Sequence, residues 1–536
     1  MLYWLILIPI VIAIINIMYF DRDSRRIILG VQLGMVVYAS YLFRWVVVNG
    51  TLIDNFGSYP RPIAITLYGD RIAIVLVWLT TLLFFGLLLF AYTRTYFTSE
   101  FGFLYLSLQS LIIGLFLSTD LFNIYVMLEV STVIIAILIM IRKDKQAIYD
   151  GMIFLFVSVI GSGFWLMGTG FLYRTFGSLD IYAIEEAIAQ VEDPRTLIVP
   201  FAFIFTTISL KIALFPLSSW LPIAYGTPSA PAVIPAVLSG VYETTGLYLF
   251  IRLSMMFRPA IDLSLLFLII GFTTSIIGFV LAVAQEDLRV MLAYSTISQV
   301  GLIVVGLALG TEESYWGSMY HMFAHALFKT VLFLAVGTIN DYYQSRMIKD
   351  IRGVLKELPL TAWAIIFGLF GITGAPLFNG SISKYMISYG SDSPYVQILL
   401  NLINFGTILY SLKFSSILFG PSSLSDAKKE AGLEPEKGQW VTFVFGLLTL
   451  LTGLFGNRVI EILYVYSFDI SFSSYLEKAG TYVLLAIAAW AINKGWVREA
   501  NIVTKIREIE LTFNAMITAL VGVFIALIAY MSLIIR

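Results

Sequence analysis

The chain has 536 residues, of which 59% are hydrophobic and only 12% are charged. Soluble domains carry about 25% charged residues, so this composition predicts a polytopic membrane protein. The net charge of −1 argues against a nucleic-acid partner. The chain has no cysteine, which excludes disulfides, thiolate metal sites and iron–sulfur clusters within it.

Stretches of about 20 apolar residues, the length of a membrane-spanning helix, recur along the whole chain. They lie near 1–20, 27–48, 71–93, 100–119, 121–141, 150–172, 197–218, 230–252, 261–284, 290–310, 316–340, 360–388, 395–419, 440–457, 479–496 and 512–535. We therefore expect an all-α protein with about 14–16 transmembrane helices. The first stretch lacks the basic residues and cleavage site of a signal peptide, so we interpret it as a span. The short stretch near 440–457 and the interrupted one near 360–388 are the weakest.

Lysine and arginine set the expected orientation. With the N-terminus outside, the inward loops hold DRDSRR, RKDK and the segments 346–356, 428–437 and 494–507. These cations then fall about two to one on the cytoplasmic side of the cell membrane, as the positive-inside bias requires.

Two segments outside the spans have amphipathic helical patterns. LDIYAIEEAIAQVED (179–193) has apolar residues on one face and acids on the other, which predicts a helix on the outer surface. WVREANIVTKIREIELTFN (496–514) is consistent with a helix along the membrane surface, a contact with a neighbouring subunit, or a solvated connector.

Several ionisable residues lie inside segments that must be buried in the membrane. They are Glu129, Lys211, Glu243, His321, His325, Lys329 and Lys384. A charge at bilayer depth costs at least a few kcal/mol, so such residues are rare and usually mark an ion or proton path.

Pairing is the expected means of keeping these groups charged. Burial disfavours an isolated charge, whereas a Glu129–Lys211 pair lets both groups ionise, and separation of the pair moves a proton. The alternative is a static ion pair that joins two helices, although buried pairs stabilise poorly. Glu243 lies at mid-span, and Lys384 can instead extend toward an interface.

His321, His325 and Lys329 are spaced four residues apart and form one stripe on a helix. Histidine titrates near neutral pH and can relay a proton. The alternatives are two histidines hydrogen-bonded to backbone, or a two-histidine metal site. Nearby, Gln299 can donate hydrogen bonds to water or between helices.

Two spans are interrupted by proline and glycine. ALFPLSSWLPIAYGTPSAPAVIP follows Lys211, and GITGAPLFNGS precedes Lys384. Such breaks free backbone carbonyls at depth, where only protein or water can satisfy them. Interrupted helices at corresponding positions of two halves indicate inverted repeats around a central pathway.

Five motifs together resemble the antiporter-like subunits of respiratory complex I. In chain order they are STDLFNIYVMLEVSTV, LKIALFPLSSWLPIAYGTPSAP, DLRVMLAYSTISQVGL, HMFAHALFKTVLFLAVG and GITGAPLFNGSISKY. They are most similar to the D-type subunit of Mrp cation/proton antiporters and its counterparts in archaeal membrane-bound hydrogenase and sulfane reductase complexes. The resemblance covers roughly 70–420.

The resemblance implies about fourteen core helices with two inverted five-helix repeats, each containing a broken helix. We accordingly divide the chain into N-terminal helices (1–99), a first repeat (100–255), a second repeat (256–420), and C-terminal helices with an amphipathic connector (421–536).

The resemblance also implies roles for particular residues. Glu129 corresponds to the glutamate of helix 5, Lys211 to the lysine of the first broken helix, His325 and Lys329 to a central relay, and Lys384 to the terminal lysine. Glu243 stands where the family usually has lysine, and Pro235 where many relatives have histidine. Either Glu243 bridges Lys211 and Lys329, or this path is modified.

The expected function is therefore that of a proton-translocating or sodium/proton-exchanging subunit of a multisubunit respiratory complex. Its expected partners are other membrane subunits, the lipid bilayer, and protons or Na⁺. No phosphate-binding loop or dinucleotide fingerprint is visible, so we expect no cofactor in this chain and no catalysis by it alone. The alternatives are a transport-modified structural subunit, a subunit of a stand-alone Mrp antiporter, or a self-sufficient antiporter.

Overall fold

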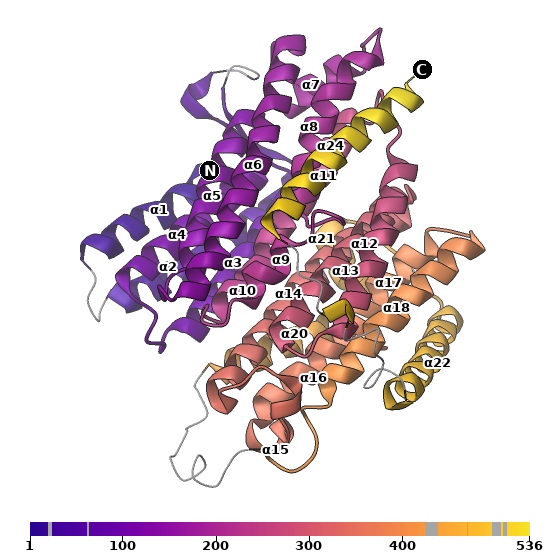
Figure 1. Ribbon diagram of the computed structural model, residues 1–536. Coiled ribbons are helices and arrows are strands. Elements are labelled where there is room, and N and C mark those ends of the chain that lie inside the picture. The colour runs from indigo at the N-terminus through magenta and orange to yellow at the C-terminus, as the bar shows by residue number, and fades with distance from the viewer. Residues whose placement is uncertain are drawn as a thin grey trace.

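The structure is a computed structural model that describes residues 1–19, 24–59, 61, 64–423, 438–468, 470–495, 505–507 and 512–535. Nearly all of these residues form one bundle of helices (Figure 1). The first helices are α1 (Tyr3–Met18), α2 (Ser24–Asn49), α3 (Arg71–Ala91), α4 (Ser99–Leu117), α5 (Leu121–Ile139), α6 (Lys145–Phe176), α7 (Ile181–Ile188), α8 (Ile198–Lys211), α9 (Trp220–Gly226), α10 (Val233–Val237) and α11 (Glu243–Phe257). The later helices are α12 (Ser264–Ala284), α13 (Leu288–Ala308), α14 (Glu312–Tyr343), α15 (Val354–Glu357), α16 (Pro359–Thr373), α17 (Asn379–Tyr389), α18 (Pro394–Ser415), α20 (Gln439–Leu454), α21 (Gly456–Tyr464), α22 (Phe472–Gly495) and α24 (Phe513–Ile534).

Each of the sixteen predicted apolar segments contains a helix, which confirms an all-α polytopic membrane protein. Among the described residues, twelve helices are long and apolar enough to cross a membrane. The weak segment near 440–457 is α20, which bends by 91° into α21, so that the pair makes up one further candidate span. The predicted segment ended at residue 457, so neither the bend nor α21, an amphipathic helix that contains Arg458 and Glu461, was predicted.

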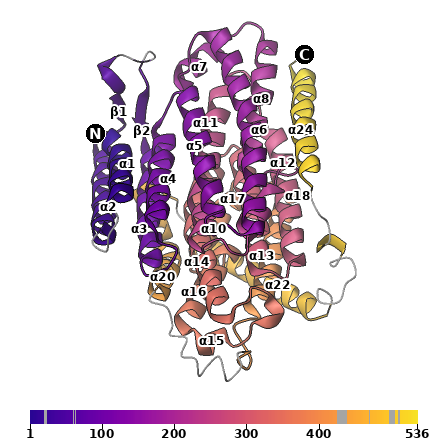
Figure 2. The same cartoon turned by 60° about the vertical axis from the view of Figure 1, so that its left-hand side comes forward.

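The elements outside the spans gather at the two ends of the bundle. An antiparallel ribbon of β1 (Leu52–Asn55) and β2 (Thr66–Gly69) lies at the same end as α7, and α15 lies at the opposite end (Figure 2). The helix predicted at 179–193 is α7, which buries Ile181, Ile184 and Ile188. The connector predicted at 496–514 lies largely outside the described residues.

The backbone contains an internal repeat with a constant offset of 167 residues (288 minus 121, and 346 minus 179). The Leu121 amide donates to the Leu179 carbonyl at 2.9 Å, and the Leu288 amide donates to the Arg346 carbonyl at 3.0 Å. Asp120 caps α5 and the equivalent Asp287 caps α13. With the same offset, α6 and α14 each have 32 residues.

This repeat is inverted with respect to the bundle axis. Between the start of α5 and the start of α13 the chain runs through α5, α6, the α8–α9 pair, the α10–α11 pair and α12. Five passes place the two equivalent positions at opposite ends of the bundle. The two predicted halves are therefore related as inverted repeats.

Both predicted helix breaks are present. The first separates α8, which ends at Lys211, from α9, and the second separates α16 from α17. A third irregularity is η3 (Leu238–Tyr242), a π-helical turn between α10 and α11. Single π turns inside α-helices often lie at functional sites. Here the turn runs close against α14, since a Cβ at Gly240 would lie only 2.4 Å from Thr330 Oγ1.

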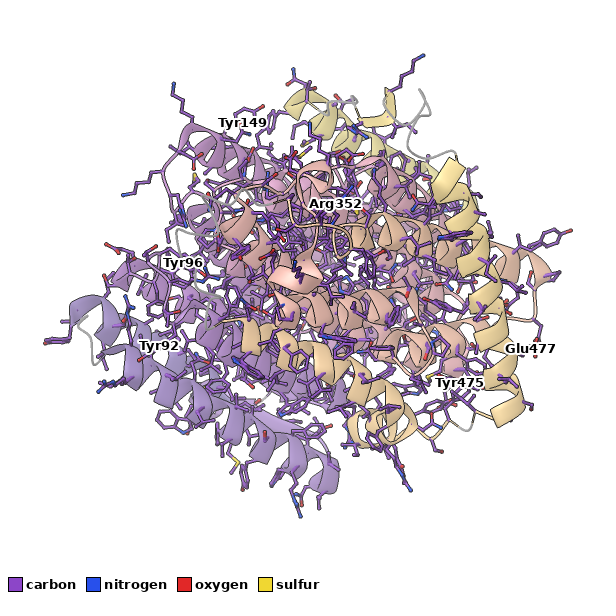
Figure 3. All side chains as sticks on the ribbon, turned by 90° about the horizontal axis from the view of Figure 1, so that it is seen from below. Tyr92, Tyr96, Tyr149, Arg352, Tyr475 and Glu477 are labelled. Atoms are coloured by element: carbon purple, nitrogen blue, oxygen red, sulfur yellow. The ribbon has the colours of Figure 1, made fainter. Side chains whose placement is uncertain are left out.

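The last two long helices, α22 and α24, pack against different parts of the bundle. α22 packs on α18, and α24 packs on α8 and α6. Seen from the end that carries α15 (Figure 3), Arg352 lies near the middle of the molecule and Glu477 of α22 lies at its edge. α22 is thus a peripheral helix.

Candidate functional site

The middle of α14 carries the predicted stripe of His321, His325 and Lys329. These three side chains are fully or almost fully buried, with exposed fractions of 0%, 1% and 0%. The burial arises because α13, α16, α17 and α20 surround α14. A stripe of titratable groups in such a position must find its hydrogen-bond partners inside the bundle.

Lys329 is held by the neighbouring helix α13. Its Nζ donates to the Leu292 carbonyl at 2.9 Å and to Ser295 Oγ. Among the described residues no carboxylate lies within ion-pair distance of Lys329, but Glu243 interacts with it electrostatically. The central lysine thus has neutral acceptors in contact and one carboxylate close enough to attract it.

His321 connects α14 to two other helices. Its Nδ1 lies 2.8 Å from Ser383 Oγ on α17, and its Nε2 lies 3.1 Å from Gln299 Oε1 on α13. Gln299 Nε2 in turn donates to Thr407 Oγ1 on α18 at 3.3 Å. His325 Nε2 is buried without a hydrogen-bond partner in the part of the chain that the structure describes. A polar connection therefore runs from the α14 stripe to the residue that precedes Lys384.

Lys384 lies on α17, just after the second helix break. Its Nζ donates to the Ile372 carbonyl at 2.7 Å and to Asn404 Oδ1 at 2.9 Å. Ile372 is in the last turn of α16, where carbonyls lack partners within the helix. Gly374, with φ of +73°, lets the chain pass close to the lysine, because a Cβ there would be 3.0 Å from Lys384 Cδ. The break thus supplies the lysine with a backbone acceptor.

Lys211 is the last residue of α8, at the first helix break. Its Nζ donates to Thr132 Oγ1 at 2.9 Å, and that oxygen lies 3.1 Å from the Tyr242 hydroxyl. The direct Glu129–Lys211 ion pair expected from the sequence is not formed, since the two described side chains are not within 4.0 Å of each other. Thr132, one turn beyond Glu129 on α5, accepts the hydrogen bond of the lysine instead.

Glu129 lies at the edge of the bundle. It is half-buried, and its Oε1 is buried without a hydrogen-bond partner among the residues described. The neighbouring positions Val126 and Val130 are 41% and 43% exposed. Glu129 therefore lies next to the lipid-facing edge of α5, and its carboxyl group is not paired with Lys211.

Glu243 begins α11, directly after the π turn. It is fully buried, and its Oε2 accepts from the Tyr225 hydroxyl at 3.4 Å, while Oε1 has no partner within the described ranges. The expected bridge between Lys211 and Lys329 is therefore indirect. Glu243 attracts Lys329 through space, whereas Lys211 is reached through Thr132 and Tyr242, the residue next to Glu243.

These residues form a row in which Lys211 lies near Glu243 by way of Thr132 and Tyr242, Glu243 attracts Lys329, and Lys329 shares a face of α14 with His321, which reaches Ser383 beside Lys384. Among the described residues, Glu129 makes no hydrogen bond to this row. Sequence inspection missed the hydroxyl and amide groups that connect this row: Thr132, Tyr225, Tyr242, Ser383, Asn404 and Thr407. A polar residue inside an apolar span was the available signal, but many such residues only bond their own helix, as Thr206 does. Alternating titratable and hydroxyl groups can pass protons in short steps.

Comparison with known proteins identifies the family to which this sequence and fold are similar. The transmembrane family described as NADH:quinone oxidoreductase/Mrp antiporter matches residues 118–409. The chain is 29% identical to the D-type subunit of the Na⁺/H⁺ antiporter of Alkalihalophilus pseudofirmus over 394 residues, which are 71% of this chain and 78% of the relative. It is 28% identical to the NADH-quinone oxidoreductase subunit N of Desulforudis audaxviator over 407 residues, 74% of this chain and 80% of the relative.

Two solved structures share the fold. A chain of the membrane-bound sulfane sulfur reductase, an archaeal respiratory membrane complex, superimposes with a TM-score of 0.77 and 24% identity, covering 92% of this chain and 99% of that one. A chain of the Mrp complex from Dietzia sp. has the same TM-score with 20% identity, covering 91% and 98%.

Proposed function

Because the chain belongs to the NADH:quinone oxidoreductase/Mrp antiporter transmembrane family, we propose that it is a proton-translocating subunit of a multisubunit membrane complex. The observation that carries the proposal is the buried row from Lys211 through Glu243, Lys329 and His321 to Lys384. A row of costly ionisable groups that crosses two inverted repeats has no evident structural purpose.

The row is arranged so that small changes in charge can move protons. Lys211, Lys329 and Lys384 each contact neutral acceptors, and no described carboxylate lies within ion-pair distance of any of them. The direct contacts of each lysine are therefore with neutral groups alone. A change in the position of a carboxylate such as Glu243 would alter the electrostatic potential at these lysines, which is a means of moving protons along the row.

The donor chemistry of the row suits protons better than sodium. Sodium, like other hard cations, is bound by several oxygen ligands. The row instead presents ammonium and imidazole nitrogens, and its two carboxylates belong to different helices, α5 and α11. Sodium exchange, as named for the antiporter relative, would need oxygen ligands outside this row.

Glu129 supports a place among other membrane subunits. A half-exposed carboxyl group at the edge of an apolar helix is unfavourable against lipid. Its Oε1 is buried within this chain, so only the remaining, partly exposed part of the side chain is available to a neighbouring chain. The likeness to chains of two multisubunit complexes agrees with this placement, so we favour a subunit over a self-sufficient antiporter.

The substitution Lys211→Ala in the intact complex tests the proposal. Proton pumping into sealed vesicles and the driving reaction are measured separately, and assembly is checked by co-purification of the other subunits. We expect pumping to fall at least tenfold because the first-half row loses its proton carrier. Lys356→Ala, a change at an exposed lysine near the α15 end, is the matched control. Undiminished pumping by an assembled Lys211→Ala complex would refute the proposal.

A further inference from the structure

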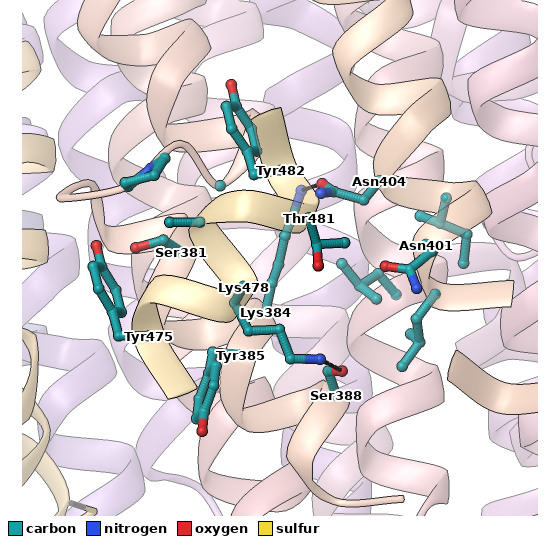
Figure 4. A pocket seen from close by; sticks show the side chains of 16 residues that line it. Ser381, Lys384, Tyr385, Ser388, Asn401, Asn404, Tyr475, Lys478, Thr481 and Tyr482 are labelled. Atoms are coloured by element: carbon teal, nitrogen blue, oxygen red, sulfur yellow. Dashed lines mark hydrogen bonds between the residues drawn. The ribbon is translucent and has the colours of Figure 1, made fainter. Parts of the chain in front are cut away.

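A cavity of about 80 Å³ lies beside Lys384, enclosed by α17, α18 and the peripheral helix α22 (Figure 4). This volume holds several water molecules. Its polar lining includes Lys384, Lys478, Ser388, Asn404 and Thr481. None of its sixteen lining residues is a carboxylate. The cavity therefore has a mixed polar and apolar lining, contains two lysines without a carboxylate, and contacts the last lysine of the row.

Lys478 is the second cation of this cavity and belongs to α22. Its Nζ donates to Ser388 Oγ at 2.9 Å. Ser388 lies one turn beyond Lys384 on α17, and its hydroxyl also donates to Gln397 Oε1 on α18 at 2.6 Å. No carboxylate in the described part of the chain lies within ion-pair distance of Lys478. Glu477, the preceding residue on α22, attracts Lys478 but does not line the cavity.

The two ammonium groups lie toward different ends of the cavity. Figure 4 shows the Lys384 side chain reaching Asn404 near Tyr482, whereas the Lys478 side chain reaches Ser388. Ser388 lies closer than Lys384 to the C-terminal end of α17. The start of α18 lies beside that end, as the hydrogen bond between Ser388 and Gln397 shows. With the predicted orientation this end faces the outer medium. Lys478 then stands between Lys384 and the outside.

A fixed positive charge has a calculable effect on ions in such a space. At a distance of about 10 Å and an effective dielectric constant of about 20, a unit charge changes the local concentration of a monovalent ion roughly tenfold. Hydrated metal cations are disfavoured by that factor, whereas a proton can leave by transfer along hydrogen-bonded water. An ammonium group in a passage is thus an electrostatic barrier to cations.

We propose that this cavity is an outward-facing vestibule through which Lys384 exchanges protons with the outer medium, and that Lys478 excludes metal cations from it. The inference rests on the proposed function, since it gives the row its outer opening. It assigns to Lys478 the role of a specificity-determining residue on α22, outside the two repeats.

The absence of native cysteine makes the proposal directly testable. Thr481→Cys places a single thiol in the cavity wall, one turn from Lys478, at a residue whose hydroxyl bonds only its own helix at Glu477. Two membrane-impermeant methanethiosulfonate reagents, one with a sulfonate and one with a trimethylammonium group, are applied to the intact complex from the outer side. Ser473→Cys, at the exposed start of α22, gives the reference rates, and the buried Ser110→Cys is the negative control.

We expect Thr481→Cys to react from the outer side and to prefer the anionic reagent over the cationic one relative to Ser473→Cys. Adding Lys478→Gln should reduce this preference about tenfold, and Lys478→Arg, which keeps the charge, should preserve it. Failure to react from the outer side, or a preference unchanged by Lys478→Gln, would overturn the proposal. Cysteine labelling does not depend on pumping, so the two proposals can fail separately. If Lys211→Ala leaves pumping intact while Thr481→Cys still reacts from the outer side, the proposed function is refuted but the accessible vestibule is not.

Discussion

Thr132 offers a sharp test of how the first half of the row works. Its Oγ1 accepts the hydrogen bond of Lys211 Nζ at 2.9 Å and lies 3.1 Å from the Tyr242 hydroxyl. Thr132→Val removes this oxygen and keeps nearly the same volume. A hydrogen bond to a charged group contributes about 1.5–3 kcal/mol. Each 1.36 kcal/mol is a factor of ten, so a transport step that depends on this hydrogen bond should become about 10- to 100-fold slower.

The assay is proton uptake by vesicles that contain the assembled complex, at a fixed rate of the driving reaction. Thr132→Val should lower the pumping rate at least tenfold, and Thr132→Ser, which restores the hydroxyl, should recover it. Ser131→Ala is the matched control, because Ser131 is buried on the same helix and bonds only the Leu128 carbonyl. Normal pumping by Thr132→Val would show that Lys211 does not depend on this oxygen.

Three further substitutions probe the rest of the row. Glu243→Gln keeps the shape but removes the charge that attracts the central lysine, so we expect pumping to fall at least tenfold in an assembled complex; normal vesicle acidification would contradict this. Ser383→Ala removes the partner of His321 Nδ1, worth about 1 kcal/mol, and should slow pumping several-fold. An unaltered rate would mean that His321 relays by another route. Gly240→Val forces a side chain against Thr330 and should destabilise the protein by about 1–3 kcal/mol, seen as a lower temperature of thermal unfolding in detergent. Unchanged thermal stability would show that η3 can move away from α14.

The positions of the helices and their breaks could be predicted from sequence because the signals are local. Twenty apolar residues specify a span, and proline with glycine specifies a break, whatever surrounds them. The row of charged residues was found for the same reason, since a charge in an apolar span is visible without knowing its neighbours.

The contacts within the row could not be predicted, because they depend on which helix faces move together. The sequence suggested a Glu129–Lys211 pair, yet Thr132 accepts the hydrogen bond of the lysine and Glu129 Oε1 has no partner among the described residues. The π turn before Glu243 rotates the helix face by an amount that no residue pattern revealed. The inverted repeats were predicted from the two helix breaks, but their offset of 167 residues became visible only in the backbone hydrogen bonds.

The attachment of α24 has a consequence for how the protein is made. Phe524 of α24 lies with its ring centroid 4.5 Å from that of Phe203 on α8 and 5.3 Å from that of Phe164 on α6. These aromatic contacts join residues more than 300 positions apart in the sequence (524 minus 203). The first repeat can therefore pack against α24 only after the second repeat has been synthesised. Until then, the partly made chain presents an unfinished aromatic surface within the membrane. A ribosome that stalls before α24 would therefore release a product that membrane quality control can recognise by an open first half.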